Sequence, residues 1–240
     1  LHCFTHFFVQ NDLSKQLLNG LGFTNVTVGG DTRFDRVAEI VARDNHLDFV
    51  EQFKGDALCV VFGSSWPAEE VYLLYLNSCK GKVKFIIAPH NIHPDEIAVL
   101  KHNKQKLDRK VALFSEKDTL NLADYEVLII DTIGILTKVY SYADIAYVGG
   151  GMGSTGLHNV LEPAVFGIPV LIGKNYSKFN EAKELVALGG VLSISSPEQF
   201  ASAMDSLINS PDKRAAIGAI NSRYITEKQG ATKAFLSVCQ

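Results

Sequence analysis

Short apolar runs alternate along the chain with segments of helical periodicity. Each run is continuous and rich in β-branched residues, which is typical of strands buried on both faces of a parallel sheet. The strands expected from this pattern lie at residues 57–63, 83–89, 111–115, 127–131, 145–150 and 169–173. An earlier segment, CFTHFFVQ at residues 3–10, is also strand-like.

The segments between these runs have the spacing of helices. Residues 67–79 (PAEEVYLLYLNSC) begin with a proline that suits a first helical turn, and residues 197–240 are helical throughout, with breaks near Ser210, Pro211 and Gly230. The repeating unit is therefore a strand followed by a helix. This order predicts an α/β fold, a Rossmann-like parallel sheet with helices on both faces, followed by terminal helices.

Composition narrows the classes of function. The chain has 240 residues, 47% of them hydrophobic, and a net charge of -3, so it is expected to be a soluble globular protein without general affinity for nucleic acid. The four cysteines are widely separated, which favours buried thiols over a metal site or a disulfide framework. Because the chain starts at Leu1 and runs straight into a strand-like segment, we expect a fragment whose N-terminal part is missing.

Polar and glycine-rich segments follow four of the expected strands. They are GSSWPAEE from Gly63, PHNIHPDE from Pro89, DTIGIL from Asp131 and GGGMGSTGLHNVLEPAVFG from Gly149. Since ligands bind outside the carboxyl ends of the strands in such sheets, these segments are expected to line one cleft.

Several of these residues have both a ligand-binding and a purely structural interpretation. Ser64 and Ser65 are expected either to bind a ligand phosphate or carboxylate or to cap the helix that begins at Pro67, two roles that are compatible. Gly134 either exposes backbone N–H groups at a helix start or forms a simple turn. His90 and His93 lack the further ligands of a metal site, so no metal is expected there.

The longest of these segments carries the sharpest hypothesis. Gly150 and Gly151 are expected to let backbone amides approach a ligand, so Gly151→Val should obstruct binding while the sheet still forms. A helix is expected over residues 159–166, and Glu162 in its first turn suits two vicinal ribose hydroxyls. His158 and Asn159 would donate hydrogen bonds nearby. The alternatives are a solvated first-turn glutamate and an Asn159 that serves only as a helix cap.

These segments resemble the nucleotide-sugar signature of GT-B glycosyltransferases, most closely that of the 3-deoxy-D-manno-octulosonic acid (Kdo) transferases of lipopolysaccharide synthesis. The match covers nearly the whole chain and rests on four segments: VGGDTRFDRV (28–37), GSSWPAEE, DTIGILTKVYSYADIAYVGGG and the sequence from Gly149 to Gly173. Three departures limit it. The family pattern Gly-Gly-His-Asn-Pro-Leu-Glu-Pro loses its second glycine and first proline, Ile135 replaces a glutamate, and an arginine is absent beside Pro89 and His90.

The resemblance implies one half of a two-domain enzyme. Residues 1–27 would be the end of the N-terminal acceptor domain and linker, and residues 28–240 the donor-binding domain for CMP-Kdo. Ser64, Ser65, Pro89, His90, Gly134, Gly150, Gly151, His158, Asn159 and Glu162 would bind the donor. It implies no cofactor or metal, a catalytic base in the missing domain, a lipid A precursor as acceptor, and a full-length protein on the cytoplasmic face of the bacterial inner membrane.

Two other classes stay open. One is a different GT-B enzyme, a transferase or an epimerase that uses a UDP-sugar, and the other is a non-catalytic nucleotide-binding module. As an isolated fragment, the chain is expected to transfer no sugar, because the acceptor side is needed to bring the two reactants together.

Overall fold

The computed structural model describes residues 1–79, 83–105 and 108–239. Its main body is a parallel sheet of seven strands in the order β5-β6-β4-β3-β7-β8-β9, so the predicted α/β fold is confirmed. These strands are β3 (Leu58–Ser65), β4 (Val83–Pro89), β5 (Val111–Leu113), β6 (Val127–Ile129), β7 (Ile145–Val148), β8 (Val170–Gly173) and β9 (Val191–Ile194). The sequence did not predict the edge strand β9.

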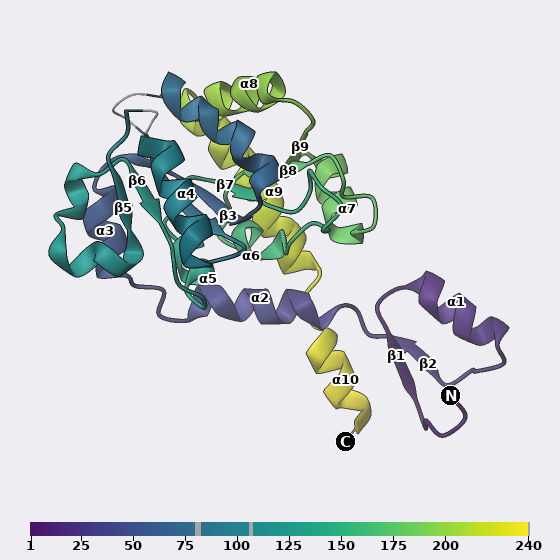
Figure 1. Cartoon of the computed structure of the whole chain (residues 1–240). Coiled ribbons are helices and arrows are strands. Elements are labelled where there is room, and N and C mark those ends of the chain that lie inside the picture. Colours follow the sequence, from purple (N-terminus) through teal and green to yellow (C-terminus); the bar gives the residue numbers. More distant parts are fainter. Residues whose placement is uncertain (80–82, 106–107, 240) are drawn as a thin grey trace.

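Helices cover both faces of this sheet (Figure 1). The α-helices are α2 (Thr32–Ala42), α3 (Asp48–Lys54), α4 (Pro94–Gln105), α5 (Leu136–Tyr140), α6 (Leu161–Ala164), α7 (Asn180–Leu188), α8 (Pro197–Ile208), α9 (Pro211–Glu227) and α10 (Ala231–Cys239). Three 3-10 helices are described as well: η1 (Pro67–Ser78), η2 (Phe114–Thr119) and η3 (Leu122–Asp124). The breaks predicted in the C-terminal helices, near Ser210 and Gly230, are confirmed.

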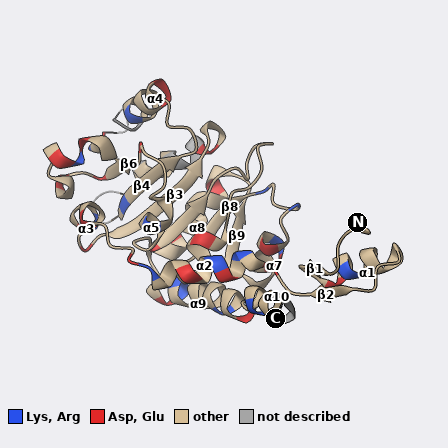
Figure 2. Ribbon diagram, turned by 90° about the horizontal axis from the view of Figure 1, so that it is seen from below, with Lys and Arg blue, Asp and Glu red and all other residues tan. Residues whose placement is uncertain are grey.

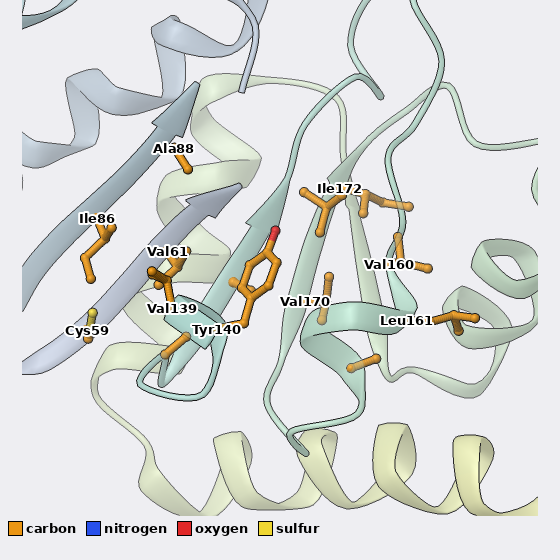
Figure 3. Packing of buried hydrophobic residues seen from close by; sticks show 14 of the residues in the cluster. Cys59, Val61, Ile86, Ala88, Val139, Tyr140, Val160, Leu161, Val170 and Ile172 are labelled. Carbon is orange, nitrogen blue, oxygen red and sulfur yellow. The ribbon is translucent and has the colours of Figure 1, made fainter. Parts of the chain in front are cut away.

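The continuous apolar runs of the sequence have a direct structural reason. Side chains alternate along a strand, so Cys59 and Val61 of β3 pack with the helices of one face, while Val60 and Phe62 pack with those of the other. Figure 3 shows the first of these two layers, where side chains from β3, β4 and β8 lie against Val139 and Tyr140 of α5. Both layers exclude water, and the strands are apolar on both faces along most of their length for that reason.

A second, smaller unit precedes the sheet. Strands β1 (Phe7–Val9) and β2 (Val26–Val28) pair in parallel, and helix α1 (Asp12–Gly20) connects them. Figure 1 shows this unit apart from the main body. Helix α10 connects the two, because the rings of Phe8 and Phe235 lie 4.9 Å apart while α10 also packs against α2. The domain boundary expected between residues 27 and 28 falls inside β2, before its last residue Val28, and stays a prediction.

Helix α2 is fixed to the main body by charge. Figure 2 shows acidic and basic residues interspersed along it. Arg33 at its start bonds to Glu181 of α7 at 2.7 Å and to Asp31, which caps the helix, at the same distance. Within the described ranges, no helix is both long and apolar enough to cross a membrane.

Candidate functional site

Three neighbouring strands end at the same edge of the sheet and bring the predicted segments together. β4, β3 and β7 are adjacent and parallel, so the chain that follows each strand emerges side by side with the others. The N–H of His90 after β4 donates to the carbonyl of Ser65 in β3 at 2.9 Å, and the N–H of His158 donates to the carbonyl of Gly149 after β7 at 3.0 Å. The expected cleft edge thus gathers segments far apart in sequence.

Three rings stack where these segments meet. The ring centroids of Trp66 and His90 lie 4.2 Å apart with the planes 19° from parallel, and those of His90 and His158 lie 4.7 Å apart. Trp66 also donates a hydrogen bond from Nε1 to Nε2 of His158 at 3.1 Å. Burial lowers the pKa of His158, and the neighbouring His90 lowers it further, so this imidazole is held neutral.

A buried carboxylate fixes the backbone of this cluster. Glu69 is 1% exposed, and its two oxygens accept the N–H of Gly150 at 2.6 Å and the N–H of Trp66 at 2.8 Å. Burial raises the pKa of Glu69, while the backbone N–H groups of Trp66, Gly150 and Met152 oppose that rise. Sequence reasoning missed both Trp66 and Glu69, and the one available signal was their position in the segment GSSWPAEE.

The serine cap predicted for the helix at Pro67 is wrong. The residue at the cap position is Trp66, and the side chain that closes the first turn is the Glu69 carboxylate on the Trp66 N–H. Ser64 instead adopts a left-handed conformation, with φ of 52°, at a bulge near the end of β3, and Ser65 is buried opposite Pro89 of β4. Both serines therefore lie at the cleft edge, where a ligand-binding role stays a prediction.

Glu162 lies in a second polar group beside this cluster. Its carboxylate accepts from Nδ2 of Asn159 at 3.2 Å and from the hydroxyl of Thr137 at 3.4 Å. Asn159 also accepts the N–H of Leu161 at 3.1 Å, but the residue at the cap position is Val160, so the alternative of Asn159 as the helix cap is wrong. The helix here spans Leu161–Ala164 and is shorter than the predicted range 159–166. Glu162 is half-buried, and its interpretation as a merely solvated first-turn glutamate does not fit these contacts.

Thr137 connects the segment DTIGIL to this group. Thr137 belongs to α5, which begins two residues after Gly134, and Gly134 has a φ of 89° with open space where a Cβ would lie. The turn at Gly134 is thus a requirement of backbone conformation rather than of packing. Behind Glu162 lies Tyr140, whose pKa is raised by burial and by the charge of Glu162.

The glycine loop is more tightly packed than the sequence suggested. Gly150 has a φ of 89° and its N–H is already bound to Glu69, while a Cβ at Gly151 would lie 2.8 Å from the backbone nitrogen of Gly173 in β8. A side chain at Gly151 must displace the end of β8, so Gly151→Val is expected to disturb this edge of the sheet as well as the loop, and the expectation that the sheet still forms stays a prediction.

A hollow of about 450 Å³ opens beside the ring stack. Ser65, Trp66 and Pro89 line it from the strand ends, and α4 closes the other side. His90 and His93 join no metal-binding group, since among the side chains that the structure describes no three of His, Cys, Asp or Glu are arranged to hold an ion.

Comparison with curated proteins gives several relatives of one kind, although no protein-family model matches the chain. A 3-deoxy-D-manno-octulosonic acid transferase of Haemophilus influenzae is 35% identical over 115 residues, which are 47% of this chain and 27% of the relative. One of Chlamydophila psittaci is 25% identical over 231 residues, 94% of this chain and 52% of the relative. The chain thus spans about half the length, or less, of these relatives.

Solved structures with a similar fold include a domain of the same kind of protein. The C-terminal CMP-Kdo binding domain of WaaA from Acinetobacter baumannii superposes with a TM-score of 0.63 at 21% identity, over 81% of this chain and 97% of that domain. A trehalose-phosphate synthase from Burkholderia xenovorans has a TM-score of 0.56 at 12% identity, over 85% of this chain and 48% of the synthase. In sequence and in fold together, the chain is similar to the C-terminal, GT-B-type domain of the 3-deoxy-D-manno-octulosonic acid transferases, and the resemblance stated from its motifs is confirmed.

Proposed function

We propose that the chain is the donor-binding part of a glycosyltransferase that moves Kdo from CMP-Kdo to a lipid A precursor. The observation that carries this proposal is the Glu162 carboxylate at the carboxyl edge of the sheet, oriented by Asn159 at 3.2 Å and by Thr137 at 3.4 Å. A half-buried carboxylate held in this way is suited to accept hydrogen bonds from two adjacent ribose hydroxyls. The similarity in fold to a CMP-Kdo binding domain supports the choice of CMP-Kdo as the donor in this proposal.

The other predicted residues surround this carboxylate in complementary roles. In the proposed complex, His158 and Asn159 donate hydrogen bonds to the phosphate or the sugar. The strand-end residues form the surface on which the donor lies: Ser64, Ser65, Pro89, His90, Gly134, Gly150 and Gly151. Donors fixed before the ligand arrives stabilise the charge that develops on the leaving phosphate without further reorganisation.

The transfer step requires a second domain in this proposal. Residues 1–27 would be the end of an acceptor domain and its linker, and residues 28–240 the donor domain. The structural support is the separate two-stranded sheet of β1 and β2, which ends at Val28. The catalytic base and the contact with the inner membrane surface would belong to the acceptor domain, so we assign neither to a residue of this chain.

A nucleotide titration tests the proposal. We expect calorimetry to show binding of CMP and CMP-Kdo in preference to UDP, and no Kdo transfer when a lipid A precursor is added to this chain alone. Glu162→Gln should lower CMP affinity by roughly 1.5–3 kcal/mol, because it removes a charge-assisted acceptor while keeping the volume. Glu39→Gln, which changes an exposed carboxylate of α2 (67% exposed), is the matched control. Equal CMP affinity in the Glu162→Gln and Glu39→Gln proteins would refute the ribose assignment.

A donor of another kind is the second candidate. The fold is shared with UDP-using enzymes, among them Anabaena HepE in complex with UDP and glucose, which superposes over 98% of this chain with a TM-score of 0.54. Tighter binding of UDP than of CMP would favour this class. A non-catalytic module would bind nucleotide yet show no transfer even when the acceptor domain of a relative is supplied.

A further inference from the structure

The stack of Trp66, His90 and His158 contains one directional contact. The indole Nε1–H of Trp66 donates to Nε2 of His158 at 3.1 Å. An indole N–H is a donor only, so Nε2 of His158 must act as the acceptor in this pair. A neutral imidazole that accepts at Nε2 carries its proton on Nδ1.

Trp66 is itself held from several sides. Its backbone N–H is bound by the buried Glu69 at 2.8 Å, and its ring lies on His90 at a centroid distance of 4.2 Å. The indole therefore has little freedom to turn its N–H elsewhere. Since Glu69 also holds Gly150, the same carboxylate fixes the indole and the glycine loop against which Cδ2 of His158 lies.

The remaining nitrogen of His158 is available to a ligand. His158 is half-buried at the cleft edge, and among the residues that the structure describes none forms a hydrogen bond with its Nδ1. A neutral N–H donor at the carboxyl edge of the sheet, next to the proposed ribose site, suits an oxygen of the nucleotide phosphate.

We propose that Trp66 is a positioning residue that fixes the tautomer of His158, so that His158 presents Nδ1–H to the phosphate of the bound nucleotide. The inference rests on the proposed function for the identity of the ligand, and it assigns a role to a residue outside the predicted site. Trp66 acts through His158 and need not touch the nucleotide.

The tautomer is measured directly from the 15N chemical shifts of the two imidazole nitrogens in protein labelled at histidine. We expect Nδ1 to carry the proton in the unmodified chain. In Trp66→Phe, which keeps an aromatic ring on His90 but lacks the N–H, that preference is lost. Detection of the Nε2–H tautomer in the unmodified chain would overturn the inference without any use of a variant.

Nucleotide binding then tests whether the contact matters. We expect Trp66→Phe to weaken CMP binding by about threefold to tenfold, the effect of losing one oriented hydrogen bond. Cytidine, which lacks the phosphate, should bind equally to both proteins. In a double-mutant cycle, Trp66→Phe should have no further effect in a His158→Ala background. An undiminished effect in that background would show that Trp66 acts independently of His158 and would overturn the proposal.

A matched control separates this role from a general loss of structure. Tyr142→Phe removes one aromatic hydroxyl, which accepts the N–H of Leu47 at 2.7 Å, at the opposite edge of the sheet. It should change neither the tautomer nor the affinity for CMP. If the unmodified chain binds no nucleotide at all, the proposed function fails, while the tautomer measurement still decides the contact between Trp66 and His158.

Discussion

Replacement of Glu69 should lower the free energy of unfolding through the carboxyl edge of the sheet. Its oxygens accept backbone N–H groups, those of Gly150 and Trp66 among them, and the residue is 1% exposed. In Glu69→Gln the new amide group must turn its NH2 toward one of these donors. One N–H then loses its partner in a place that water does not reach.

The magnitude follows from these contacts. A hydrogen bond to a charged group contributes about 1.5–3 kcal/mol, and a buried donor left without a partner costs about 1–3 kcal/mol. The relief of a buried negative charge offsets part of that loss. We therefore expect Glu69→Gln to lower the free energy of unfolding by about 2–4 kcal/mol, measured by urea denaturation at pH 7.

The control is Glu39→Gln, which alters an exposed carboxylate paired with Arg43 and should change stability by less than about 0.5 kcal/mol. Hydrogen exchange at Gly150 provides a local measurement, since this amide should lose protection in Glu69→Gln. The reasoning is refuted if the two variants are equally stable and the exchange of Gly150 is unchanged.

The dependence on pH has a definite sign. Burial raises the pKa of Glu69 above its ordinary value of 4.5 in spite of the N–H groups that it binds. Folding therefore favours the protonated carboxyl. The protonation of Glu69 adds to the free energy of unfolding in full below pH 4.5, and this addition is lost as the pH rises through the raised pKa. Glu69→Gln lacks this titration, so its deficit relative to the unmodified chain should be larger in acid than at neutral pH.

Other substitutions test the backbone and the C-terminal helix. Gly151→Val should lower the free energy of unfolding by about 1–3 kcal/mol in urea denaturation, because its side chain overlaps Gly173. Gly134→Ala should lower it by about 1–2 kcal/mol through backbone strain alone, since the space around Gly134 is open. Burial raises the pKa of Asp35, but the N–H groups at the start of α10 outweigh it and lower the pKa overall. The contribution of Asp35 to the stability of α10 is thus complete above the ordinary pKa of about 3.8 and is lost as the pH falls through the lowered pKa. We therefore expect faster hydrogen exchange in α10 in strong acid and in Asp35→Asn.

The strands of the main sheet were predictable because both faces are buried. A strand between two helical layers is apolar at nearly every position, so its sequence is distinct from that of a helix with one polar side. Strand β9 escaped prediction because it is a four-residue edge strand whose apolar run is interrupted by the half-buried Ser193. Strand β2 is three residues long and lies in the small separate sheet, where no long apolar run is needed.

The sequence was sufficient to predict that the candidate site lies at the carboxyl edge of the sheet, but not which side chains contact one another there. Parallel strands alone dictate that the segments after β3, β4 and β7 meet, and that was sufficient to bring His90 and His158 together. Their partners depend on side chains that cross the fold: Trp66 reaches His158 across 92 positions, and Glu69 reaches Gly150 across 81. No local pattern encodes such pairs, because periodicity records which face a residue presents and not which residue lies opposite. The glycines show the same limit, because the sequence does not distinguish a glycine that leaves room for a ligand from one that packs against protein atoms. Gly150 and Gly151 were predicted to be of the first kind. In the structure, Gly150 binds the Glu69 carboxylate and Gly151 packs against the backbone of β8.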